Sequence, residues 1–294
     1  MKNPIVINLL LLLIAFIWGL GFVPQRLGME YIGPGAFNAL RFALGAITIA
    51  PLFFIMKSTS LADLTDITTI KLGFVLGLLL FFGATFQQIS IQYTSLANVS
   101  FITGLYAIIV PLIGYFMGYR YAVMVWVGGI IAIIGLYLMT GQSTQLSLWG
   151  DFLALIGAVF WAIQLLVLAR LSDDQEQLSL AFYQFVVCAV FSVFIALGYE
   201  GVLFPETLRG YLWPVVNGFF VVGIAYTLQV LVLKHAEPFA ASLILSLEAV
   251  FGALGGYLVF NERLGAAALV GAAMMLLGCL LVQYYDAPKE SIKK

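Results

Sequence analysis

Long apolar runs separated by short polar breaks make up nearly all of this sequence. A helix of about 20 residues, rising about 1.5 Å per residue, crosses the roughly 30 Å hydrocarbon layer of a bilayer. Ten runs have this length, at residues 5–24, 35–56, 72–91, 97–117, 123–141, 150–169, 179–198, 212–233, 239–260 and 265–285. The sequence therefore predicts an all-α integral membrane protein with ten transmembrane helices.

The composition supports this prediction and narrows the function classes. Hydrophobic residues make up 63% of the chain and charged residues only 9%, whereas soluble domains carry about 25% charged residues. The Lys and Arg residues are scattered and the net charge is −1, which gives no basis for a nucleic-acid partner. Cys188 and Cys279 lie in apolar runs and His235 in a short loop, so we expect neither a disulfide framework nor a metal or other cofactor.

The distribution of Lys and Arg predicts the orientation in the membrane. The first apolar run is too long for a signal-peptide core, so we expect it to be retained. If the amino terminus is cytoplasmic, nine Lys and Arg residues lie in inner segments and three in outer ones, as the positive-inside rule requires. The outer three are Arg26, Arg209 and Arg263. Both termini, including a tail at 286–294, should then be cytoplasmic and the membrane the cell inner membrane.

The chain also repeats itself with a shift of 143 residues. AFIW at 15–18 matches AVFW at 158–161, and VGGIIAIIG at 127–135 matches VGAAMMLLG at 270–278. The repeats cover 5–141 and 150–285, with five spans each. Because five is odd, the second copy enters the membrane from the opposite side. This predicts two inverted five-helix repeats, an arrangement found in many secondary transporters.

Glu248 is a carboxylate near the middle of the ninth span. Eight residues precede it in the run that starts at Ala240, which places it about 12 Å deep. An ionised group at such a depth costs about 2.5–3.5 kcal/mol on insertion scales. Gly252 and Gly255 share its helix face, so other helices can approach closely. We expect Glu248 to face a cavity; a packing carboxylate bonded to a neighbouring hydroxyl or amide is the alternative.

Other polar and aromatic residues within the spans are candidates for the same cavity. Gln87 is favoured over the adjacent Gln88 because Gln229 lies at its repeat equivalent, 142 residues later. The alternative for each amide is a hydrogen bond between helices. The remaining candidates are Trp18, Asn98, Thr103, Tyr106, Trp161, Gln164 and Tyr226.

Arg41 lies about two turns inside the second span, where two outcomes are open. Its side chain can extend to the outer surface, or it can meet an anionic group in the cavity. A pair between Arg41 and Glu248 is a further hypothesis.

Several segments carry a resemblance to a known family. They are WGLGF at 18–22, ALRFALGAI at 39–47, QYTSLANVSFITGLYAIIVPLIG at 92–114 and LILSLEAVFGALGGYLVFNERL at 243–264. In this order and spacing they resemble ten-span members of the drug/metabolite transporter superfamily, built from two EamA domains. The resemblance covers about residues 5–285. It implies small-molecule transport through a central cavity by alternating access, most often export of amino acids, other metabolites or drugs. Ala249 departs from the proline that often follows the corresponding glutamate.

These features favour a secondary transporter that exports a small molecule. The chain lacks the G-x-x-x-x-G-K-[ST] phosphate-binding motif, which excludes ATP-driven pumping by this chain alone. A buried Glu248 can bind a proton on one side and release it on the other, so protons are a candidate coupling ion, while uniport fits equally. Amino acids, aromatic metabolites and amphipathic drug-like compounds suit the candidate lining. An intramembrane enzyme and a non-transporting scaffold are the rival hypotheses; a monomer or a homodimer fits the internal repeat.

Overall fold

The computed structural model describes residues 3–55, 66–118, 120–140, 147–171, 177–261 and 265–285. All regular structure in these ranges is helical. Seven helices or helix runs in them are long and apolar enough to cross a membrane, and shorter apolar helices cover 123–138 and 269–282. Each of the ten predicted spans coincides with helical structure. The predicted tail at 286–294 and most of the connection at 57–71 lie outside the described residues.

The helices fall into two sets that follow the predicted repeats. The first set is α1 (Pro4–Gly28), α2 (Pro34–Ile49), α3 (Leu52–Ile55), α4 (Ile67–Ser90), α5 (Leu96–Gly104), α6 (Tyr106–Phe116) and α7 (Val123–Thr140). The second set is α8 (Leu148–Ala169), α9 (Gln177–Ile195), η2 (Ala196–Glu200), α10 (Leu208–Val216), η3 (Asn217–Tyr226), α11 (Thr227–Leu233), α12 (Pro238–Leu245), α13 (Glu248–Phe260) and α14 (Ala266–Tyr285). The elements η2 and η3 are π-helical and continue α9 and α10.

Short polar side chains fix where several helices begin. Asn3 accepts a hydrogen bond from the Ile5 amide, and Pro4 opens α1. Asp66 accepts from the Thr69 amide at 2.7 Å, which lowers the pKa of the Asp66 carboxyl. Such caps satisfy amides that the first turn leaves without a partner.

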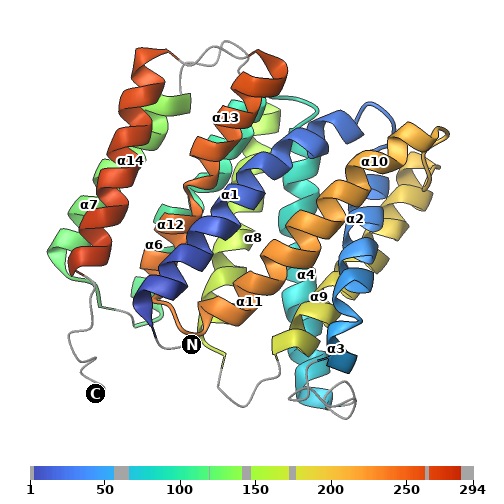
Figure 1. Ribbon diagram of the computed structural model, residues 1–294, viewed down its shortest axis with the longest axis horizontal. Helices are drawn as coiled ribbons and strands as arrows, with labels where there is room; N and C mark the ends of the chain where they lie inside the picture. The colour runs from blue at the N-terminus through green and yellow to red at the C-terminus, as the bar shows by residue number, and fades with distance from the viewer. Residues whose placement is uncertain are drawn as a thin grey trace.

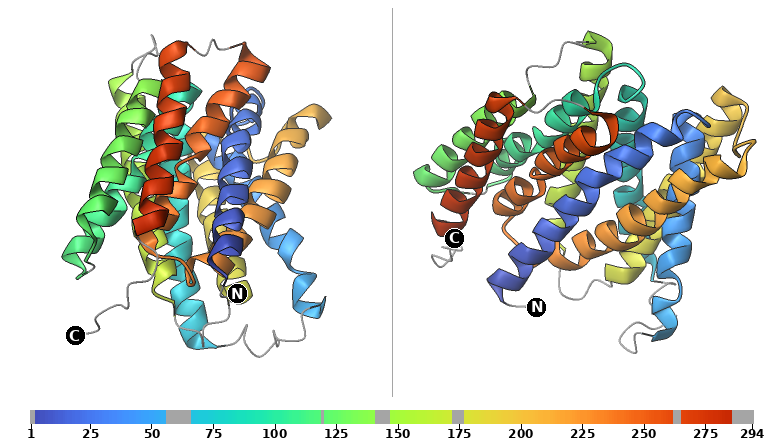
Figure 2. Two further views of the ribbon diagram at one scale, coloured as in Figure 1. Left: turned by 60° about the vertical axis from the view of Figure 1, so that its left-hand side comes forward. Right: turned by 45° about the horizontal axis from the view of Figure 1, so that its top comes forward.

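The helices pack side by side into one bundle whose start and end lie toward the same end (Figure 1). The pair α7 and α14 forms one edge of the bundle (Figures 1 and 2). α1 lies between α13 and the run formed by α10, η3 and α11. Large apolar side chains cover the outside, including Leu9, Phe74, Val190, Phe220 and Leu277. An apolar outer surface on so many helices matches the lipid-facing surface of a membrane protein.

Glycines bring α7 and α14 together in a symmetric way. A Cβ on Gly135 would lie 2.5 Å from the Gly271 carbonyl oxygen, and one on Gly278 would lie 2.5 Å from the Gly128 carbonyl oxygen. Gly135 and Gly278 are 143 positions apart, as are Gly128 and Gly271, so exchanging the repeats maps the two contacts onto one another. Because the later glycine of α7 meets the earlier glycine of α14, these equivalent helices run antiparallel.

The other large contacts also pair up when the repeats are exchanged. α4 packs on α9 in parallel, with Gly73 against Tyr183 and Gly77 against Val187. The equivalent contact is that of η3 with α2, also parallel, in which Gly223 meets Thr48. The contacts of α1 with α12 and α13 correspond in the same way to those of α8 with α5 and α6. The two halves therefore interlock rather than forming separate domains.

We predict that alanine at Gly135 or Gly278 destabilises the bundle. The added methyl group has no room between two backbones, so each substitution should lower the free energy of unfolding by about 1–3 kcal/mol. Thermal unfolding of purified protein in detergent measures this effect. Gly198→Ala is the control, because no atom lies within 4 Å of the added methyl group. Equal melting temperatures for all three variants would contradict this account of the α7–α14 contact.

Candidate functional site

A cavity lies at the centre of the bundle, where helices of both halves meet. The space that the centre of a water molecule can occupy in it is about 30 Å³, which is room for about two waters. Its lining combines polar and aromatic side chains in an otherwise apolar bundle. The lining residues are Trp18, Phe22, Gln25, Arg41, Gln87, Thr103, Tyr106, Trp161, Leu165, Val221, Tyr226, Gln229, Leu245 and Glu248.

Two helix interruptions border this cavity. α5 and α6 are separated by Leu105, and α12 and α13 by Ser246 and Leu247. Tyr106 and Glu248 are the first residues of the helices that follow. These breaks lie at equivalent places in the two repeats, and the second one occurs although Ala249 replaces the proline of the family pattern. The interruption brings the positive end of α13 to the Glu248 carboxylate, where a negative charge is favoured.

Glu248 is enclosed almost completely, with 4% of its surface exposed. Its Oε1 atom has no hydrogen-bond partner among the described residues, and the hydroxyl of Tyr106 interacts with the carboxylate. Gly19 lets α1 approach, since a Cβ there would lie 2.4 Å from the Glu248 carbonyl oxygen. The carboxylate therefore has an acceptor oxygen free for a ligand or a proton.

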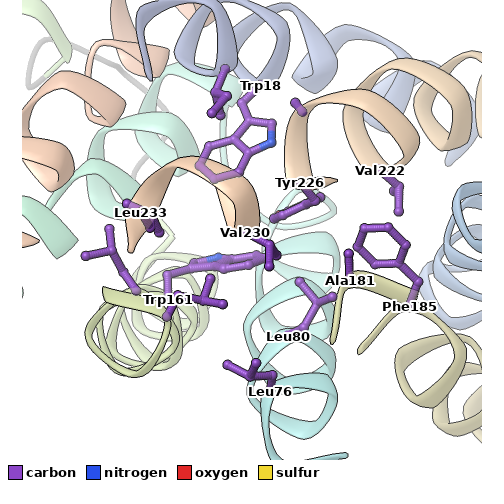
Figure 3. Packing of buried hydrophobic residues seen from close by; sticks show 14 of the residues in the cluster. Trp18, Leu76, Leu80, Trp161, Ala181, Phe185, Val222, Tyr226, Val230 and Leu233 are labelled. Carbon is purple, nitrogen blue, oxygen red and sulfur yellow. The ribbon is translucent and has the colours of Figure 1, made fainter. Parts of the chain in front are cut away.

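Three aromatic rings form one wall of the cavity. Trp161 stacks on Tyr226 with ring centroids 5.6 Å apart and an interplanar angle of 17°. Trp18 lies 4.8 Å from Tyr226 by the same measure, and Figure 3 shows the three rings beside one another. Both indole nitrogens are buried without a hydrogen-bond partner in the described structure. This wall offers flat apolar surface together with two unused donors.

Arg41 is buried in the protein and does not extend to the surface. Only 1% of its surface is exposed, so the surface alternative is wrong. Its Nη1 donates to Asn217 Oδ1 at 3.1 Å, and Asn217 Nδ2 donates to the Gly21 carbonyl at 3.0 Å. The guanidinium carbon lies 4.9 Å from the centre of the Phe42 ring. Contacts with α1, α2 and η3 thus hold the Arg41 guanidinium inside the protein, although a charged group would be better hydrated at the surface.

The hypothesis of an Arg41–Glu248 pair finds no support in the hydrogen bonds. Arg41 Nε and Nη2 and Glu248 Oε1 all lack a hydrogen-bond partner among the described residues. Both side chains line the same cavity without bonding to one another.

The amides divide between the cavity and the interfaces. Gln87 lines the cavity and donates to Thr103 Oγ1 at 3.1 Å, whereas Gln88 donates to the Gln25 carbonyl. Gln164, also a predicted site residue, is not among the residues that line this cavity. Its amide bonds with Gln184 and with Gln229, which does line the cavity.

Asn98, another predicted site residue, is also not among the residues that line this cavity. Its side-chain amide donates to Thr94 Oγ1 one turn earlier, at 3.1 Å. Thr94 lies just before the start of α5, so this bond joins the first turn of the helix to the residue that precedes its cap. The nine other predicted residues all line the cavity: Glu248, Trp18, Gln87, Thr103, Tyr106, Trp161, Tyr226, Gln229 and Arg41.

The sequence analysis did not identify Gln25, Phe22, Leu165, Val221 and Leu245 as lining residues. Gln25 could have been found, because positions 18, 22 and 25 share one face of α1. The three aliphatic residues carry no signal that separates a cavity wall from the rest of the core. In the described ranges no group of three His, Cys, Asp or Glu residues is placed to hold a metal ion.

Comparisons with known proteins point to one family. The sequence profile of the EamA-like transporter family matches residues 5–141 and 148–284. An uncharacterized transporter of Archaeoglobus fulgidus is 29% identical over 277 residues, covering 92% of this chain and 84% of that one. The uncharacterized transporter YoaV of Bacillus subtilis is 21% identical, covering 91% and 93%. A protein of known crystal structure shares the fold with a TM-score of 0.79, at 16% identity, over 97% of this chain and 99% of that one.

We predict that the hydrogen bonds of Asn217 stabilise the bundle. Asn217→Ala removes the partner of a buried guanidinium and the donor to Gly21. It should cost about 2–4 kcal/mol of unfolding free energy. Asn38→Ala is a matched control, because Asn38 is fully buried on α2 and neither of its amide atoms is hydrogen-bonded. It should cost less than about 1 kcal/mol. Thermal unfolding in detergent tests this, and a control that is as unstable as Asn217→Ala would contradict it.

Proposed function

Because this chain belongs to the EamA-like transporter family, we propose that it is a secondary transporter that exports a small metabolite by alternating access. Membership confirms the resemblance to the drug/metabolite transporter superfamily, and its relatives are likewise named transporters. The observation that carries the proposal is the central cavity, which holds charged, amide and aromatic side chains and is lined by helices of both halves. A polar cavity is costly in a bilayer unless a polar ligand or ion uses it.

Alternating access needs two states of similar energy, and an inverted repeat can supply them. If the halves have opposite orientations, each can adopt the conformation of the other and open the cavity to the opposite side. The antiparallel, symmetric contact of α7 with α14 supports this relation. The cavity admits about two waters at its present width, so we propose that it widens toward one side before a metabolite enters.

The nine predicted residues on the cavity are proposed to contact the substrate. Trp18, Trp161 and Tyr226 would hold an apolar or aromatic part of it, and the amides of Gln87 and Gln229 would orient polar groups. Amino acids and aromatic metabolites fit this combination. The direction of export rests on the family resemblance.

Glu248 is the proposed coupling residue. Its partner-free oxygen and its burial favour a carboxyl group that gains a proton when the cavity faces one side and loses it when the cavity faces the other. The protein would then move a proton across the membrane in one direction and a substrate molecule in the other. Uniport, with Glu248 acting only as a substrate ligand, is the simpler form of the same mechanism.

We predict that Glu248→Gln lowers flux at least tenfold and removes its dependence on pH. The amide keeps the shape of the side chain but cannot exchange a proton. The measurement is counterflow of pooled labelled amino acids and aromatic metabolites in proteoliposomes, with and without a proton gradient. Glu237→Gln is the control, because Glu237 is exposed at the start of α12 and caps nothing with its side chain. Unchanged flux with an unchanged pH profile in Glu248→Gln would show that the coupling role is wrong.

We propose that the membrane is the cell inner membrane and that both termini are cytoplasmic. A fluorescent protein that folds only in the cytoplasm, fused to the carboxyl terminus, should fluoresce, and a periplasm-dependent phosphatase at the same place should be inactive. Fusions at Gly201 should give the opposite result, with no fluorescence and an active phosphatase. Gly201 follows the seventh predicted span and lies in a segment predicted to be outside the cytoplasm. Equal signals at both positions would contradict the ten-span arrangement.

A further inference from the structure

We propose that Arg41 is the binding site for a carboxylate of the transported molecule, so that the substrate is an organic acid or a zwitterion rather than an amphipathic cation. This inference rests on the proposed transport function and narrows it to a substrate class.

The unused atoms of the guanidinium define a specific docking edge. Nη1 is occupied by Asn217 Oδ1, while Nε and Nη2 have no partner among the described residues. Nε–H and Nη2–H point the same way from one side of the planar group. That side matches the two oxygens of a carboxylate, which can accept two parallel hydrogen bonds.

The guanidinium is held so that this edge keeps its direction. The Asn217 side chain bonds Arg41 on one side and the Gly21 carbonyl on the other, which ties α2, η3 and α1 together. Phe42 and Phe37 lie against the guanidinium, with the central carbon 4.9 Å and 5.7 Å from their ring centres. Asn217 is thus a positioning residue for Arg41.

No acid in the described structure neutralises this buried cation. The ionisable groups that act on Arg41 are Tyr226 and Cys188, a phenol and a thiol that are ordinarily neutral at neutral pH. Glu248 lines the same cavity but does not bond to Arg41. A buried charge without a counter-charge is unfavourable, and a substrate carboxylate supplies the missing charge.

The remaining lining favours a single negative charge on the ligand. A phosphate dianion would bring two charges to one cation and would lie in the same cavity as the Glu248 carboxylate. A carboxylate balances Arg41 one to one. An ammonium group elsewhere on the same molecule would find an acceptor in Glu248 Oε1, which has no partner in the described structure.

Equilibrium binding tests the inference without requiring transport. Tryptophan fluorescence of the purified full-length protein reports on the cavity, because Trp18 and Trp161 line it. The probes are three matched pools: L-amino acids with simple aromatic monocarboxylates, the carboxamides and amines of the same compounds, and small phosphate monoesters. We expect saturable binding from the acid pool and binding at least tenfold weaker from the two other pools.

Two arginine variants separate the docking edge from charge alone. Arg41→Lys keeps the positive charge but loses the forked donors, and we expect at least tenfold weaker binding of the acids. Arg26→Lys is the matched control, since Arg26 also lies over a phenylalanine ring, at 5.6 Å from that of Phe260, but does not line the cavity. It should bind the acids as the unmodified chain does. A melting temperature for each variant verifies that it is folded.

Several outcomes would overturn the carboxylate site. They are binding of amines or phosphate esters as tight as that of acids, acid binding unaffected by Arg41→Lys, and no binding of any acid by folded protein. Flux of the same pools in proteoliposomes separates this inference from the proposed function. If Arg41→Lys leaves the flux unchanged, the chain is a transporter but Arg41 is not the carboxylate site. If acids bind in an Arg41-dependent way but no flux is measured, the carboxylate site is supported and the proposed transport function is contradicted.

Discussion

The structure depends on one constraint: a polar group inside a bilayer must find a partner within the protein. Lipid offers no hydrogen bonds, so the polar side chains of the spans turn toward the interior and toward one another. Gln229 donates to Gln164, and Gln164 donates to Gln184. Some polar atoms without a partner in the described structure, such as Arg41 Nε and Glu248 Oε1, belong to residues that line the cavity, whereas others, such as those of Asn38, lie elsewhere. The cavity residues carry such atoms beside space that a bound molecule could enter.

The same constraint explains why glycine shapes the bundle. Between helices in lipid the hydrophobic effect is weak, so close backbone packing supplies much of the attraction. Gly128, Gly135, Gly271 and Gly278 allow such packing between α7 and α14, and Gly19 allows it between α1 and α13. Contacts of this kind permit little gradual deformation, because a few tenths of an ångström already cause a clash. Motion is then expected between rigid groups of helices and at the interruptions inside α5–α6 and α12–α13.

The sequence predicted the helical segments and most of the cavity, for an identifiable reason. In an apolar chain each polar residue is conspicuous, and its place on a helix face follows from the helical period, as with Glu248 and Gln87. Gln164 and Asn98, two of the predicted site residues, bond to Gln184 and Thr94 and do not line the cavity. The burial of Arg41 depends on Asn217, which lies 176 residues later in the chain. No local pattern contains that contact.

The sequence analysis also did not predict the π-helical segment η3, which carries two residues of the site. η3 runs for ten residues from Asn217 to Tyr226, whereas π-helical turns are usually single and occur at functional sites. Its first residue holds Arg41, and its last lies between Trp18 and Trp161. A helix with this wider turn has weaker internal hydrogen bonding, so it can change its winding at lower cost than a regular helix. Rewinding η3 would move the support of the guanidinium and the aromatic wall together.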